Sequence, residues 1–193
     1  MEELKTIELF IDSEKETDEV YAISLVETPA IEEDFVALSK EEVLLKSIDD
    51  EKRIVVGLAL VPNKKILRKG KEGYYNIILS KETVKEASEI FLKRMYTNNA
   101  TLEHQEKTVG VSFVESWIVE NPEMDKINLY GIKAPEGAWA VVGKVESDEV
   151  WSDVKDGKYY GFSIEGIFSN REAETEVDLY KEKVENIKKI LGL

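Results

Sequence analysis

Closely spaced segments rich in branched and aromatic residues fill the chain from Ile54 to Phe168, and they constrain its fold more than any other sequence feature. Each segment has the length of a strand and is bounded by Gly, Pro, Asn or Asp, which favour turns. A succession of short strands separated by turns predicts a mainly antiparallel β-sheet or β-barrel. The predicted strands are Ile54–Val61, Tyr74–Leu79, Val109–Val119, Ile127–Ile132, Ala138–Val145 and Lys158–Phe168.

Helical patterns interrupt and follow the strands, which places the chain in the α+β class. Ser80 is a suitable N-cap for a helix that ends near Tyr96. A shorter helix is predicted over Asp148–Lys155, and another begins near Thr175. The apolar stripe of this last helix must be buried against the core or against a partner. Its members are Val177, Tyr180, Val184, Ile187 and Leu191.

The chain divides into a mixed opening, a main domain and a terminal helix. Apolar and polar residues alternate over Ile7–Ile11, as in a half-buried strand, whereas Lys40–Glu51 is charged and predicts a short helix or linker. We therefore expect residues 1–50 to be an N-terminal extension that could pack on the core. The main domain is expected over residues 51–172 and an amphipathic C-terminal helix over residues 173–193.

The composition excludes several kinds of site. The chain has no cysteine, which rules out a disulfide scaffold, a thiol nucleophile and cysteine-ligated zinc, and its single histidine rules out a histidine-rich metal site. The turn with Glu120, Glu123 and Asp125 lacks the glycine and final glutamate of a calcium-binding loop, so we interpret it as solvated. We expect neither a metal nor a cofactor.

Charge and hydropathy restrict the partners. A net charge of −14 at pH 7 argues against nucleic-acid binding, which depends on Lys and Arg beside phosphates. No apolar run approaches the ~18 residues that a membrane-spanning helix needs, and the first residues do not resemble a signal peptide. We expect protein partners, no nucleic acid, no membrane and a cytosolic location.

His104 and Ser163 are the side chains best suited to chemistry. His104 is the only group whose unperturbed pKa lies near neutrality, which makes it the natural candidate for a general base. Ser163 shares a strand face with Gly161 and Glu165, where an extended peptide could approach the backbone. Taken alone, each has a simpler interpretation, because a lone histidine is more often structural and many strands carry a solvent-facing serine.

A third residue would orient the imidazole, and Glu115 is the first candidate. Alternation places it on an otherwise apolar strand face with Val109, Val111, Phe113, Trp117 and Val119. A carboxylate there needs a partner, which could be His104 once it is protonated, or equally a lysine, an arginine or backbone N–H groups. Glu165 is the next candidate, and Glu103 and Asp153 are further alternatives.

The surroundings of the serine argue against an α/β-hydrolase. That fold requires glycines two residues before and two residues after the serine, and a histidine later in the chain. Here the glycines are Gly161 and Gly166, and His104 precedes Ser163. The sequence does not reveal the backbone donors of an oxyanion hole, although Arg171, just past the serine, could supply or order one.

Five short segments, in this order, resemble the XkdF-type phage serine proteases. They are Ser24-Leu-Val-Glu-Thr-Pro-Ala-Ile31, Val56-Gly-Leu-Ala-Leu-Val-Pro62, Leu102-Glu-His-Gln105, Val114-Glu-Ser-Trp-Ile-Val119 and Gly161-Phe-Ser-Ile-Glu-Gly166. The likeness runs from about residue 20 to residue 170. These proteases are similar to the prohead maturation proteases of tailed phages, which share a fold and a His-before-Ser order with herpesvirus assemblins.

The resemblance implies a mainly antiparallel β-barrel flanked by helices, with His104 as the base and Ser163 as the nucleophile. It implies a serine endopeptidase that digests phage scaffold and major capsid proteins, and often itself, inside the procapsid in the bacterial cytoplasm. The resemblance is compatible with a homo-oligomer of this chain. The herpesvirus enzymes use a second histidine, which this chain lacks, so either a triad here ends in a carboxylate or the site is only a Ser-His dyad.

Two other classes of protein fit parts of the same pattern. A non-catalytic capsid-assembly scaffold with this fold would account equally well for the acidity and for the apolar C-terminal stripe. An acidic mimic of nucleic acid would need its carboxylates on one contiguous face, and the sequence shows no periodicity of that kind.

Overall fold

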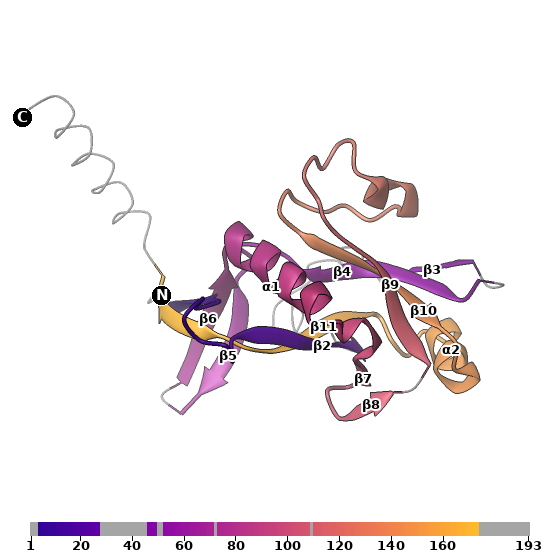
Figure 1. Cartoon of the computed structure of the whole chain (residues 1–193), viewed down its shortest axis with the longest axis horizontal. Coiled ribbons are helices and arrows are strands. Elements are labelled where there is room, and N and C mark those ends of the chain that lie inside the picture. The colour runs from indigo at the N-terminus through magenta and orange to yellow at the C-terminus, as the bar shows by residue number, and fades with distance from the viewer. Residues whose placement is uncertain (1–3, 28–45, 50–51, 72, 109, 174–193) are drawn as a thin grey trace, which may run out of the picture.

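The computed structural model describes residues 4–27, 46–49, 52–71, 73–108 and 110–173, which form strands and short helices (Figure 1). The helices are α1 (Lys81–Lys93), α2 (Asp148–Lys155) and the 3₁₀ helices η1 (Tyr96–Asn98) and η2 (Lys126–Tyr130). The strands are β1 (Thr6–Phe10), β2 (Glu19–Val26), β3 (Lys46–Asp49), β4 (Ile54–Leu60), β5 (Ile66–Gly70), β6 (Gly73–Leu79), β7 (Ala100–Leu102), β8 (Glu106–Thr108), β9 (Val111–Ile118), β10 (Trp139–Val145), β11 (Gly161–Ile167) and β12 (Ser169–Glu172).

The strands form three four-stranded sheets, with orders β12-β1-β6-β5, β3-β4-β10-β9 and β11-β2-β7-β8. The pairs β1–β6 and β2–β7 are parallel and the others are antiparallel. The α+β class is confirmed. The expected closed barrel is wrong for the described part of the chain, because each sheet there ends in two edge strands. Alternation along a segment predicts that it is a strand, but carries no information on which strand pairs with it.

Most predicted elements are confirmed, and the segment Ile127–Ile132 is the clearest exception. Its first part is the 3₁₀ helix η2, because the Asp125 carboxylate accepts the backbone N–H of Ile127 at 2.8 Å as a cap. Gly131, at φ 67°, ends the helix in the left-handed conformation. A run of apolar residues too short to show its period was therefore misassigned as a strand.

The first fifty residues contribute one strand to each of the three sheets. Strand β1 lies between β6 and β12, and β2 lies between β11 and β7, with Val20, Ile23 and Leu25 fully buried. The predicted helix or linker over Lys40–Glu51 is wrong for residues 46–49, which form β3. The rest of that segment and the predicted helix from Thr175 lie outside the described residues.

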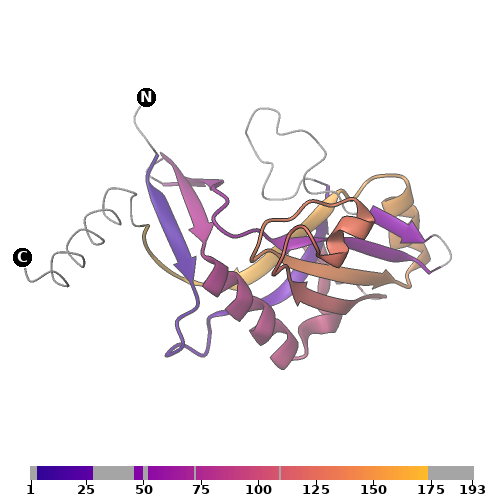
Figure 2. The same ribbon diagram turned by 90° about the horizontal axis from the view of Figure 1, so that it is seen from above.

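A series of aromatic rings connects helix α1 to the strand that carries Ser163. Phe91 of α1 meets Trp139 and Phe113 edge to face, with ring centroids 5.5 and 6.0 Å apart. Phe113 in turn meets Phe162 at 5.7 Å. Such pairs are favourable beyond the burial of their area, so they fix β11 against the core through the residue next to the serine. Figure 2 shows α1 lying across these strands.

Asp18 is a buried carboxylate that joins the N-terminal strands to the start of β12. Only 3% of the residue is exposed, and one carboxylate oxygen accepts the N–H groups of Asp12 and Ser169 at 3.1 and 2.8 Å. Burial by itself would raise the pKa of Asp18. The hydrogen bonds from Asp12 and from the hydroxyl and N–H of Ser169, together with the charge of Lys15, outweigh burial and lower that pKa.

We expect Asp18→Asn to lower the free energy of unfolding by roughly 1–3 kcal/mol near neutral pH, because the charged acceptor of two buried N–H groups is lost. The folded pKa lies below the unfolded value of about 3.9, so this stabilisation is complete above about pH 4 and is lost as the pH falls through the folded pKa. Urea unfolding of both proteins across this pH range measures the difference. The exposed Glu14→Gln is the control; a pH-independent deficit of Asp18→Asn would contradict the assignment.

Among the described residues, no helix is long and apolar enough to cross a membrane.

Candidate active site

Three hydroxyl side chains form a row across adjacent strands of one sheet. Ser163 on β11 lies directly opposite Ser24 on the antiparallel β2, and Ser24 is aligned with Thr101 on the parallel β7. Residues paired in this way project to the same face of a sheet. Phe162 and Ile164 project to the other face, where they pack into or against the core. The row therefore marks one face of the sheet β11-β2-β7-β8.

His104 lies in the turn between β7 and β8 and is held in an uncommon backbone conformation. Glu103 and His104 have φ values of 50° and 57°, in the left-handed region that costs energy for any residue with a Cβ. The Glu103 N–H donates to the carbonyl of Leu25 at 3.1 Å, and its carboxylate accepts the N–H of Glu27 at 2.5 Å. The His104 N–H donates to the Ser24 hydroxyl at 3.0 Å. Strand β2 thus holds the turn in place.

The imidazole of His104 meets the carboxylate of Glu165. The Nδ1 atom lies 3.4 Å from Oε1 of Glu165, and the Thr101 hydroxyl donates to the same oxygen. The side chain of His104 is 41% exposed and that of Glu165 is 18% exposed. A carboxylate beside Nδ1 favours a proton on that nitrogen, which leaves Nε2 free to act as a base.

The structure brings His104, Ser163 and Glu165 to one sheet, although no hydrogen bond joins the imidazole to the Ser163 hydroxyl. Ser163 is only 7% exposed, and Ser24 lies between its strand and the histidine turn. Catalytic hydrogen bonds often tighten only when substrate binds, so this separation is compatible with a nucleophile and base. The sheet therefore presents a serine hydroxyl, an imidazole and a carboxylate, the three kinds of group that a serine hydrolase combines.

Glu115 lies elsewhere, because β9 belongs to the sheet β3-β4-β10-β9, and a bulge in β9 also changes the face on which Glu115 lies. Glu115 pairs with Val142 on β10, but the next pair joins Phe113 to Gly143, so the residue between them has no opposite partner. The extra residue shifts the alternation, and the prediction that Glu115 shares a face with Phe113 is therefore wrong. The Glu115 carboxylate forms an ion pair with Lys126 instead of approaching the candidate base.

The remaining predicted site residues also have other partners. Arg171 on β12 forms two hydrogen bonds with the carboxylate of Glu8 on β1, at 2.8 and 3.0 Å. Asp153 pairs with Lys158 at 2.7 Å. Glu103 accepts a backbone N–H, as described above, so its carboxylate braces the turn.

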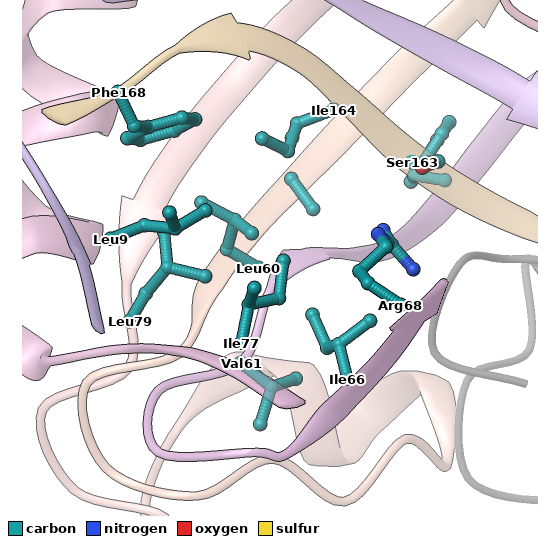
Figure 3. A pocket seen from close by; sticks show the side chains of 12 residues that line it. Leu9, Leu60, Val61, Ile66, Arg68, Ile77, Leu79, Ser163, Ile164 and Phe168 are labelled. Carbon is teal, nitrogen blue, oxygen red and sulfur yellow. The ribbon is translucent and has the colours of Figure 1, made fainter. Parts of the chain in front are cut away.

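A pocket opens beside Ser163. Its empty volume is about 500 Å³, including the space at its mouth. Figure 3 shows Ser163 and Arg68 at one end and Leu9, Leu79 and Phe168 at the other. The full lining consists of Leu9, Ala59, Leu60, Val61, Ile66, Arg68, Ile77, Leu79, Phe162, Ser163, Ile164 and Phe168.

The sequence-based search missed three residues of this region: Ser24, Thr101 and Arg68. Ser24 begins one of the segments that carry the family resemblance, which was its only signal. Thr101 stands three residues before His104, but nothing in that spacing indicates a contact with Glu165. Arg68 lies on β5, a strand that the search did not recognise.

Comparison with known families agrees with the resemblance noted in the sequence. A family model described as "Putative phage serine protease XkdF" matches residues 40–172, most of the chain. The protein belongs to this family. No curated protein and no solved structure matches the chain.

Proposed function

We propose that the protein is a serine endopeptidase in which Ser163 is the nucleophile, His104 the general base and Glu165 the orienting carboxylate. The observation that carries the proposal is the contact of Glu165 with Nδ1 of His104 on the sheet that also presents Ser163. Membership of a family described as phage serine proteases supports the same reaction. Ser163 also lines a pocket, which gives a substrate access to its strand.

In the proposed reaction, the Ser163 oxygen attacks the scissile carbonyl while Nε2 of His104 takes the hydroxyl proton. His104 then gives this proton to the leaving amine, and the C–N bond breaks to leave an acyl-enzyme. Water, deprotonated by the same nitrogen, attacks the ester and releases the second product with regeneration of the Ser163 hydroxyl. The negative charge of Glu165 stabilises the imidazolium that forms in each step.

We further propose that the substrates are the scaffold and major capsid proteins of a tailed phage, and the protease chain itself. The description of the family as a phage protease supports this setting, and so does the similarity of its motifs to prohead maturation enzymes. The place of action would be the procapsid within the host cytoplasm.

A serine-directed phosphonate probe tests the proposed nucleophile. The probe forms a covalent bond only with an activated serine, so intact-mass and peptide-mass measurements should find one adduct, on Ser163. His104→Ala should slow labelling by on the order of 10²–10⁴-fold, the contribution of a general base. Absence of any adduct in the unaltered protein would favour the non-catalytic scaffold.

Ser24 offers a test of how the histidine turn is held. Ser24 is fully buried, and Ser24→Ala removes the hydroxyl that accepts the His104 N–H. We expect the free energy of unfolding to fall by about 1 kcal/mol. Because the proposed base is then held less precisely, we also expect kcat to fall at least about tenfold at similar KM. Ser24→Thr should restore much of kcat. Ser88→Ala, which removes a buried hydroxyl within α1, is the control; an equal loss of kcat there would indicate a general effect of destabilisation.

A further inference from the structure

The pocket beside Ser163 has a polar end and an apolar body. At the polar end lie the Ser163 hydroxyl and the Arg68 guanidinium, as Figure 3 shows. Every other lining side chain is apolar. Ser163 is 7% exposed, yet it lines this pocket, so a substrate has a route to the nucleophile along the pocket wall.

The pocket lies where two sheets end. Strand β11 has a ladder partner on one side only within the described chain, and the same is true of β5. Both strands contribute lining residues, and the rest of the wall comes from β1, β4, β6, Val61 and Phe168. An extended peptide beside the end of a sheet can direct alternate side chains into such a pocket.

We propose that this pocket binds the side chain of the substrate residue whose carbonyl Ser163 attacks, and that it selects an aliphatic side chain such as leucine or methionine. The inference rests on the proposed function. The Cα atom of this substrate residue is bonded directly to the attacked carbonyl carbon. Its side chain can therefore reach a pocket that begins at the nucleophile.

The side chains that line the pocket determine which chemical class of substrate side chain it binds. A hydrophobic pocket distinguishes side chains by about 10–200-fold for each methylene that it buries. A carboxylate or ammonium group pushed among Leu9, Leu79 and Phe168 would lose its hydration without a charged partner there. The aliphatic preference follows from the body of the pocket, whereas the polar end is adjacent to the reacting carbonyl.

A series of peptidyl phosphonates that differ only in the side chain next to phosphorus tests this proposal, with labelling of Ser163 followed by intact mass. We expect the leucine-type probe to react at least about tenfold faster than the alanine-type probe, and faster than the lysine and glutamate types. Equal rates, or a faster charged probe, would overturn the pocket assignment and leave the nucleophile standing. If no probe labels Ser163, both the proposed function and this inference fail.

A matched pair of variants connects the selectivity to the pocket itself. Ile77 on β6 lines the pocket, and the next residue, Ile78, is also half-buried but belongs to the other face of the strand. Ile77→Ala should enlarge the pocket and raise the ratio of phenylalanine-type to leucine-type labelling several-fold. Ile78→Ala should leave that ratio unchanged. A ratio that does not respond to Ile77→Ala in the folded protein, as judged by circular dichroism, would contradict the proposal.

Discussion

Ser163→Ala is expected to abolish both self-processing and the cleavage of a co-expressed scaffold protein, with the fold intact. The variant removes one oxygen, and its site on β11 accepts alanine without a clash because the replacement is smaller. Without a nucleophile no acyl-enzyme forms, and loss of such a residue lowers kcat by on the order of 10⁶-fold in well-studied serine proteases. Electrophoresis of the co-expressed proteins measures cleavage of the scaffold protein, and the mass of the purified chain measures self-processing.

The matched control is Ser152→Ala, which removes an exposed serine from α2 and should leave cleavage unchanged. Thermal unfolding of both variants verifies that they fold. Continued cleavage of the scaffold protein by purified Ser163→Ala would show that another residue is the nucleophile.

Glu165→Gln is expected to have the second largest effect, a fall in kcat of on the order of 10³–10⁴-fold. The amide keeps the size of the side chain but removes the charge that stabilises the imidazolium, and it can present an N–H to Nδ1 and so favour the wrong tautomer. Because the proposed role of this carboxylate is to orient the base and not to bind substrate, KM should change little. Steady-state kinetics on a peptide substrate separate the two constants.

Glu115→Gln distinguishes the two carboxylates that the sequence offered. Glu115 lies on a different sheet from the candidate site and forms an ion pair with Lys126 of η2. We therefore expect kcat of Glu115→Gln to stay within about twofold of that of the unaltered protein. If Glu115→Gln caused the large loss and Glu165→Gln did not, the third member would have been misassigned. The comparison uses the same chemical change at both positions, so it isolates the effect of place in the fold.

The sequence predicted the two α-helices and most of the strands that caps and turns bound, with Ile127–Ile132 as the exception. Ser80 caps α1 as expected, and Ser147 caps α2 in the same way; their hydroxyls accept the N–H groups of Thr83 and Val150. The sequence did not predict which strands pair, because pairing depends on which apolar faces meet in three dimensions. The expectation of a barrel was wrong for this reason. Strands with short or mixed patterns, such as β5 and β7, were not recognised in the sequence.

The choice of carboxylate shows a second limit of sequence reasoning. A single unpaired residue on β9 reversed the side-chain alternation beyond Phe113, and this moved Glu115 away from the face where regular alternation had placed it. Glu165 was recognised as the alternative because it follows Ser163 by two positions, on the same face of one strand. Its contact with His104 depends on the turn after β7, whose left-handed residues have no clear sequence signature.

The parts of the candidate site come from three distant stretches of the chain: β2 with Ser24, the segment from Thr101 to His104, and β11. Contacts between such distant stretches form late, since long loops must close first. During synthesis, a chain that has emerged only as far as β7 and its turn contains the proposed base but not the proposed nucleophile. We therefore expect hydrolytic competence to arise only once β11 has been made and has docked beside β2, so that a growing chain cannot cut itself or its neighbours on the ribosome.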